Sequence, residues 1–91
     1  MNKLNIINDL AKEKNLTIKD SEKIVSTIVE EISKSLVLGE RVEFRGFGIF
    51  FVKSRKKRIA RNPKTGELIN IKAKRLPQFR IAKHFFEKIN R

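Results

Sequence analysis

Basic side chains are concentrated in one stretch of this sequence, residues 53–75. The ten lysines and arginines in it are opposed by a single acid, Glu67, so the stretch carries a net charge of +9. Residues 1–52 hold eight basic and eight acidic residues, and the last sixteen residues add only +3. A surface that only has to be soluble mixes charges of both signs, so this localised charge predicts a polyanionic partner: DNA, RNA or anionic lipid. The ten basic residues are Lys53, Arg55, Lys56, Lys57, Arg58, Arg61, Lys64, Lys72, Lys74 and Arg75.

The middle of the basic stretch carries a turn signal. Asn62 can accept hydrogen bonds from the nearby backbone, Pro63 presets its own φ, and Gly66 can take the positive φ that closes a short hairpin. The residues on both sides alternate in character as strand residues do. The sequence therefore predicts a two-stranded ribbon over about residues 53–75, slim enough to lie along a groove of double-stranded DNA.

Pro63 would lie at the tip of this ribbon. From the turn alone, a structural proline is the simpler interpretation. However, phosphate binding does not explain an apolar ring between Arg61 and Lys64, and minor-groove proteins insert apolar wedges, proline among them, between base steps to kink the duplex. We therefore expect minor-groove binding with bending by proline intercalation.

Groups suited to catalysis or metal binding are few. The chain has no cysteine and one histidine, His84, and its acids form neither a Ser-His-Asp set nor a carboxylate cluster. The sequence thus predicts no enzyme, no metal or other cofactor, and no small-molecule substrate. The lack of cysteine fits a cytoplasmic protein, and the apolar runs are too short for a targeting or membrane-spanning segment. We expect no membrane partner, because the basic stretch has the pattern of a strand pair and not of a basic amphipathic helix.

Hydrophobic periodicity predicts the elements that hold the ribbon. Apolar residues recur at helical spacing over about residues 3–14 and again from Thr17, which with Asp20 resembles a capping box. Gly39 is placed to end this second helix with a positive φ. From Arg41 the period changes to strand-like alternation, and a last apolar helical pattern lies near the C-terminus.

This order of elements predicts one α+β domain over residues 1–91. It comprises a helical hairpin over about residues 1–38, a three-stranded antiparallel sheet with a long protruding ribbon, and a short C-terminal helix. The body without the ribbon has 68 residues, yet it holds all seven phenylalanines. Because so small a core supplies little stability, we expect part of this aromatic surface to be buried in an intertwined dimer.

The chain resembles the bacterial HU/integration host factor family over essentially its whole length. The resemblance rests on Gly39-Glu40-Arg41-Val42, Gly46-Phe47-Gly48, Phe50, Val52, Arg58, Arg61-Asn62-Pro63-Lys64-Thr65-Gly66-Glu67, Pro77, Phe79 and Lys83. It implies a dimer whose helices form a base and whose two ribbons wrap around DNA. It also implies a nucleoid-associated protein that compacts double-stranded DNA, largely without sequence specificity, in the bacterial cytoplasm.

The resemblance further implies roles for single residues. Pro63 corresponds to the wedge, and Arg61, Asn62 and Lys64 correspond to tip contacts with DNA. Arm contacts are implied for Arg55 and Arg58, contacts with phosphates on the flank of the body for Lys3, Arg80 and Lys83, and a shared dimer core for Phe47, Phe50 and Phe79.

Several positions depart from the family pattern. Ala60 stands where a glycine is usual, Lys72 replaces a frequent arm proline and could make the return strand more regular, and Ile81-Ala82 replaces a Pro-Gly pair before the last helix. Ile49 and Phe51 replace more polar residues, which makes the second face of the sheet more apolar and could favour a particular partner.

The branch within the family stays open. Glu43 and Arg45 resemble the integration host factor β subunit, where they take part in sequence preference, and that interpretation implies a heterodimer with a paralogue. We favour an HU-like homodimer. An RNA-binding or ribosomal protein is the distant alternative, because basic charge alone permits it.

Overall fold

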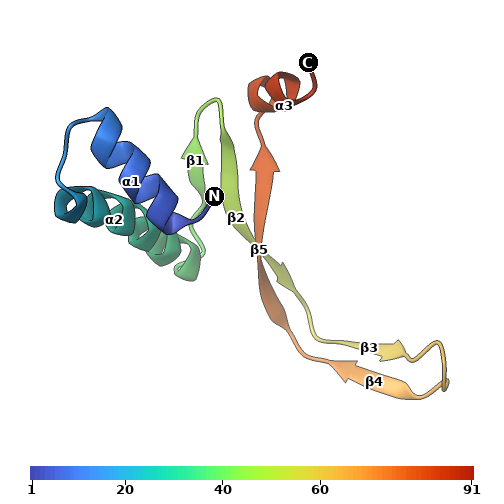
Figure 1. Ribbon diagram of the computed structural model, residues 1–91. Helices are drawn as coiled ribbons and strands as arrows, with labels where there is room; N and C mark the ends of the chain where they lie inside the picture. Colours follow the sequence, from blue (N-terminus) through green and yellow to red (C-terminus); the bar gives the residue numbers. More distant parts are fainter.

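The computed structural model describes residues 1–91 and confirms an α+β fold with a protruding arm (Figure 1). Two helices pack as a hairpin beside a sheet, and a third, short helix ends the chain. The elements are α1 (Lys3–Glu13), α2 (Ile18–Val37), β1 (Val42–Phe44), β2 (Gly48–Arg55), β3 (Arg58–Arg61), β4 (Leu68–Ile71), β5 (Lys74–Ile81) and α3 (Lys83–Ile89).

Side chains cap the first two helices in different ways. The Thr17 hydroxyl accepts a hydrogen bond from the Asp20 N–H at 3.1 Å, so the expected start of α2 is confirmed, although Asp20 makes no return bond. A reciprocal capping box is instead present at α1, where the side chains of Asn2 and Asn5 each accept the other's backbone N–H. The sequence does not signal this box, because two asparagines are not its usual composition. Gly39 has a φ of +80°, as expected for the residue that ends α2.

A buried hydroxyl joins the two helices of the hairpin. Ser21 is fully buried, and its hydroxyl donates a 2.6 Å hydrogen bond to the carbonyl oxygen of Ile7. Ile7, Ala11 and Val25 are the buried apolar residues around this contact. Ser21 therefore adds a buried hydrogen bond to the interface between α1 and α2, which otherwise consists of a few aliphatic side chains.

Removing this hydroxyl should destabilise the protein modestly. We expect Ser21→Ala to lower the free energy of unfolding by about 1 kcal/mol, the usual net contribution of one buried hydrogen bond. The control is Ser54→Ala, since Ser54 is exposed in the strand Gly48–Arg55 and its hydroxyl should contribute much less. Urea unfolding of both variants measures the difference, and equal losses would contradict the assignment.

The sheet has the strand order β1-β2-β5, and all its pairs are antiparallel. Its register places Val42 opposite Phe50, and Phe50 opposite Phe79, so these side chains share one face. Glu43, Ile49 and Arg80 are aligned across the three strands on the other face. We call the first the aromatic face and the second the outer face.

The aromatic face holds a cluster of phenylalanine rings. Phe50 and Phe79 have ring centroids 4.8 Å apart, and Phe47 lies 5.3 Å from Phe79 and 5.0 Å from Phe85. Phe44 is edge-on to Phe47 and Phe50. Even so, Phe47 and Phe79 keep 44% and 42% of their surface exposed, so the chain by itself does not bury this cluster.

The arm consists of two ladders with a break between them. The β2–β5 ladder extends to the pair Arg55–Lys74, and the β3–β4 ladder begins at Arg58–Ile71. The break falls at residues 56–57 and 72–73, so the regular return strand that Lys72 suggested is wrong. The arm gives the chain a radius of gyration of 19.1 Å and a longest extent of 60 Å, whereas a compact chain of this length has a radius of about 12 Å.

Candidate nucleic-acid interface

The tip of the arm is closed by hydrogen bonds around Asn62. Its side-chain oxygen accepts the Lys64 N–H at 2.9 Å, its N–H donates to the Glu67 carbonyl, and its carbonyl accepts the Gly66 N–H. Gly66 has a φ of +75°, which confirms the predicted turn. Pro63 is exposed at this hydrogen-bonded tip. The turn therefore presents the ring to solvent and does not pack it against the arm.

Arg58 and Arg61 project from opposite faces of the outer ladder. Arg58 pairs with Ile71 and Arg61 with Leu68, and residues three apart in a strand point to opposite sides. Both side chains are exposed. A ribbon in a groove could thus meet both walls of phosphates with guanidinium groups, which bind phosphate oxygens through several donors.

The root of the arm carries its charges on the outer face. Lys53, Arg55 and Lys74 share this face with Arg80, and all four are exposed. Of the four remaining arm lysines, Lys64 is exposed in the turn at the tip, and the others lie exposed at the break between the ladders: Lys56, Lys57 and Lys72. The arm is therefore cationic over its whole length.

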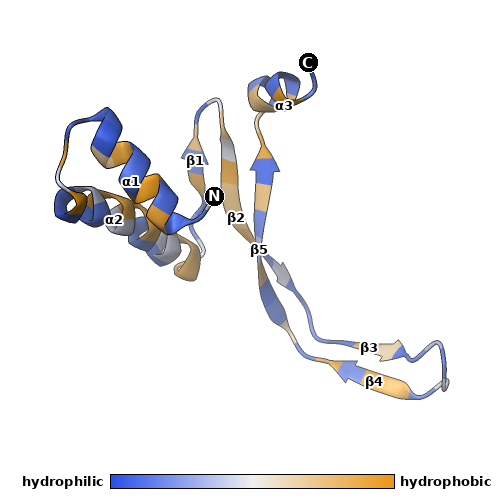
Figure 2. Cartoon of the chain, viewed as in Figure 1, coloured by the Kyte–Doolittle hydropathy of each residue, from blue (hydrophilic) through white to orange (hydrophobic).

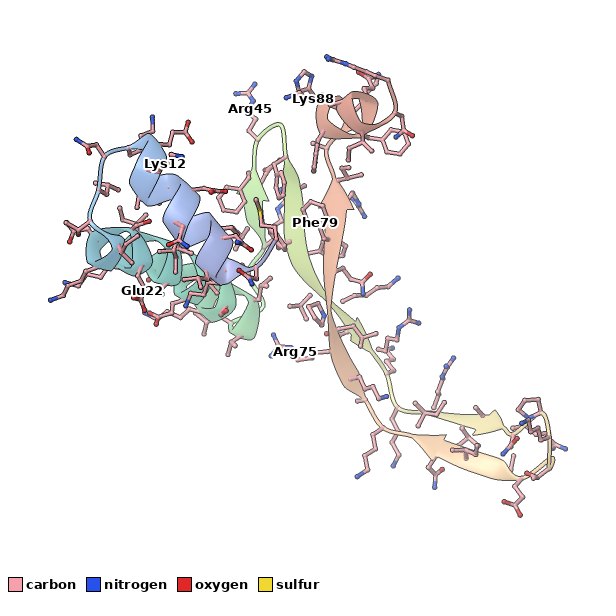
Figure 3. The ribbon with its side chains drawn as sticks, in the orientation of Figure 1. Lys12, Glu22, Arg45, Arg75, Phe79 and Lys88 are labelled. Atoms are coloured by element: carbon pink, nitrogen blue, oxygen red, sulfur yellow. The ribbon has the colours of Figure 1, made fainter.

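Arg75 is oriented differently from the other arm cations. It pairs with Ser54 on the face opposite to Lys53 and Arg55, and its Nη2 donates a 3.2 Å hydrogen bond to the carbonyl oxygen of Leu36 near the end of α2 (Figure 3). The Leu36 carbonyl also accepts the Gly39 N–H, and a basic side chain near a helix C-terminus interacts favourably with the helix dipole. The sequence suggested that Arg75 contacts DNA. In the structure its guanidinium instead points toward the body and binds the end of α2. No local pattern indicates this contact, since it joins residues 39 positions apart.

Two hollows lie on the outer face of the body. One, of about 160 Å³, is lined among others by Glu43, Arg45 and Arg80, so the structure brings the two candidate specificity residues together with a candidate flank cation. The other, of about 250 Å³, is lined by Arg41, Ile49, Phe51 and Arg80. The Arg80 guanidinium carbon is 5.4 Å from the centroid of the Phe51 ring, within the range of a cation–π contact. Arg41 is the lining residue for which the sequence predicted no role.

The remaining flank cations begin two helices. Lys3 is the first residue of α1, and Lys83 is the first of α3; both are exposed. Helix α3 starts after Ala82, which provides no side-chain cap, and the Ala82 N–H donates to the Phe47 carbonyl at 3.0 Å. This bond attaches the end of β5 to the turn between β1 and β2.

The structure shows no group of three or more histidine, cysteine or acidic side chains suited to a metal ion. None of its helices is both long and apolar enough to cross a membrane.

Comparison with known proteins gives the chain its family. The family model described as bacterial DNA-binding protein matches residues 1–90. The chain belongs to the HU/integration host factor family. Members of this family are architectural DNA-binding proteins and not enzymes, so the expectation that the chain is not an enzyme is confirmed.

Relatives from both branches of the HU/integration host factor family align over nearly the full length. Integration host factor subunit beta of Histophilus somni is 44% identical over 91 residues, covering 99% of this chain and 97% of that protein. DNA-binding protein HU of Clostridium pasteurianum is 40% identical over 91 residues, covering 100% of both. The names of these relatives therefore do not separate the two branches.

Solved HU structures share the fold of this family member. The HU–DNA cocrystal structure from Anabaena superposes with a TM-score of 0.83 at 36% identity, covering 98% of this chain and 97% of that one. HU from Thermotoga maritima gives a TM-score of 0.69 at 30% identity, with 98% of each chain covered.

Proposed function

We propose that this protein binds double-stranded DNA in the minor groove through its arm, largely without regard to sequence, and bends it by inserting Pro63 between base steps. The observation that carries the proposal is an exposed proline at the hydrogen-bonded tip of a ribbon whose charge is almost entirely positive. The similarity to an HU crystallised with DNA supports it.

Affinity in this mechanism comes mainly from counterion release. Each lysine or arginine that neutralises a phosphate releases a condensed counterion, so the logarithm of the binding constant falls by about 0.9 per contact for each decade of salt. The proposed contacts are the nine lysines and arginines of the arm other than Arg75, Asn62 at the tip, and Lys3, Arg80 and Lys83 on the body. None of these phosphate contacts depends on the base sequence.

Bending comes from the tip. Unstacking a base step costs a few kcal/mol, and this cost is offset when the bent duplex reaches additional cations on the body. Flexible, mismatched or nicked sites should bind better, since less of that cost remains. By bending many sites in this way, the protein would compact DNA in the nucleoid of the bacterial cytoplasm.

Replacing Pro63 tests the wedge. We expect Pro63→Ala to reduce the ring-closure efficiency of short DNA strongly, because the apolar wedge is removed, while affinity changes less and the salt slope stays the same. The control is Lys64→Ala, which should lower the salt slope by roughly 0.9 for each phosphate that is no longer neutralised and keep ring closure by bound protein. Unchanged ring closure by the Pro63 variant would refute intercalation.

The amount of exposed surface supports a dimer. The chain exposes 8250 Å², whereas a compact monomer of its mass exposes roughly 5,500 Å². The arm accounts for part of this excess, but large apolar side chains on the body are also uncovered. They include Ile28, Val29, Val37, Leu38, Phe44, Phe47, Phe79 and Phe86.

A second copy of the chain is the proposed cover for this surface. Val29, Val37 and Leu38 line a hollow of about 520 Å³ on α2, and Phe47, Phe50 and Phe79 are proposed to join a shared core with the partner. Unfolding should then depend on protein concentration. A soluble, concentration-independent monomer would contradict the dimer, and a chain that is unfolded when expressed alone would favour a heterodimer with a paralogue.

Sequence preference is the second candidate for the function. Glu43, Arg45 and Arg80 line one hollow, where a charged pair could favour particular duplexes. Competition among random, A-tract and nicked duplexes at several salt concentrations distinguishes the two candidates: a large preference for one intact sequence favours the integration host factor-like one. Duplex RNA in the same assay tests the RNA alternative, because A-form grooves do not suit a minor-groove wedge.

A further inference from the structure

Two aliphatic side chains on the arm are left uncovered. Ile59 in β3 and Leu68 in β4 expose 68% and 69% of their surface. Figure 2 shows that these strands carry apolar residues at the far end of the arm, away from the body. Charge-based binding to phosphates gives no reason for such residues at these positions.

The register of the outer ladder places both on one face. Ile59 pairs with Asn70, and Leu68 pairs with Arg61, so the four side chains point to the same side. Ile59 and Leu68 are diagonal neighbours across the two strands, close enough for long side chains to touch. They form a small apolar patch beside Arg61, which we call the Ile59–Leu68 patch.

The opposite face of the same ladder differs. It carries Ala60 and Ile71, which are half-buried, and Ile69, which is 44% exposed. These side chains pack against one another and stabilise the ribbon. The Ile59–Leu68 patch is therefore free for an external partner.

The surrounding charge selects the partner. A second arm would bring another +9 against the first, so association of arms through this patch is opposed by repulsion. A polyanion is attracted instead. Among polyanions, double-stranded DNA offers a groove that admits a slim ribbon, and the walls of the minor groove are deoxyribose rings whose C–H surface is apolar.

We propose that the Ile59–Leu68 patch packs against the deoxyribose walls of the minor groove and provides a share of the affinity that does not depend on salt. This inference rests on the proposed function, because it requires the arm to lie in that groove. Burial of apolar surface releases no counterions, so it adds the same amount to the logarithm of the binding constant at every salt concentration. The arm then holds DNA by two separable contributions, one ionic and one apolar.

The test uses the full-length protein with both residues changed to threonine. Threonine is branched at Cβ and favours strands, and Ile59→Thr with Leu68→Thr replaces the outer apolar carbons of each side chain with a small hydroxyl. Titration of a short intact duplex over a series of salt concentrations should show a Kd raised roughly tenfold at every salt, as expected for losing about two buried methylene groups. The slope of log K against log salt should match that of the parent.

The matched control is Ile69→Thr on the opposite face. It makes the same chemical change in the same ladder but leaves the patch intact, so its Kd should stay within about twofold of the parent. An effect of Ile69→Thr as large as that of the double variant would assign the loss to order within the ribbon and overturn the proposal.

Three other results would also overturn it. The first is a double variant that binds like the parent at all salt concentrations, and the second is a salt slope that falls together with the affinity, which would mean that the whole arm has disengaged. The third is light scattering on DNA-free protein that shows association beyond the dimer in the parent and only the dimer in the double variant. Failure of the proposed function gives another result: the parent protein would not bind duplex DNA, or replacing Arg58 would leave its affinity for duplex DNA unchanged.

Discussion

Replacing Arg58 and Arg61 together with alanine should weaken duplex binding roughly 100-fold or more at low salt. The two guanidinium groups project from opposite faces of the β3–β4 ladder, so the double variant loses one cation from each face of this ladder. Each phosphate that is no longer neutralised should also lower the salt slope by about 0.9. Titration of one duplex at several salt concentrations yields both quantities.

A matched variant separates a local effect from a change in net charge. Lys12→Ala with Lys14→Ala removes the same charge from the end of α1, and Figure 3 shows Lys12 on the helical hairpin, away from the arm. We expect these changes to leave the salt slope nearly as in the parent, because exposed charges beyond a Debye length are screened. Equal losses of affinity in the two double variants would contradict a binding role confined to the arm.

Replacing Gly48 with alanine should have the largest effect on stability. Gly48 is buried in β2, where a Cβ atom would overlap the Phe79 ring and lie 2.6 Å from the Arg80 carbonyl oxygen. A backbone carbonyl in the ladder cannot move aside as the end of a flexible side chain can. We expect the free energy of unfolding to fall by about 3 kcal/mol or more, since the β2–β5 ladder and the Phe50–Phe79 contact must both shift.

Gly46, two residues earlier, is the control. It has a φ of +84°, but a Cβ there would meet no atom within 4 Å. Gly46→Ala should therefore cost only about 1–2 kcal/mol, from the conformation alone. Denaturant unfolding of both variants at one protein concentration measures the two costs. If Gly48→Ala were no more destabilising than Gly46→Ala, the close packing of β2 on β5 would be contradicted.

The sequence predicted those features that depend on neighbouring residues. Helical spacing located α1, α2 and α3, Gly39 marked the end of α2, and the group Asn62, Pro63 and Gly66 located the turn at the arm tip. These predictions succeed because each signal acts within a few residues of chain. The break at residues 56–57 gave no such signal, because a run of lysines and arginines is compatible with both strand and loop.

Contacts between distant segments could not be predicted in this way. In the sequence, Arg75 is one basic residue among many and nothing distinguishes it from its neighbours. Only its pairing with Ser54 in the sheet directs its guanidinium toward Leu36. In the same way, the sequence shows Ile59 and Leu68 as two apolar residues nine positions apart. The ladder alone places them on one face, beside Arg61.

The positive charge of the arm and the proline at its tip were thus determined by the sequence alone, since the number of basic residues and the spacing of the turn residues can be read directly from it. The tertiary structure decided which way each cation points, because side-chain direction in a strand follows from register, and register depends on the partner strand. The same reason separates Arg75, which holds the arm root to α2, from Arg55 and Arg58, which remain exposed. Strand pairing thereby gives the residues of the arm three different placements. Arg75 binds α2, the other cations form an exposed positive surface, and Ile59 and Leu68 form an apolar patch.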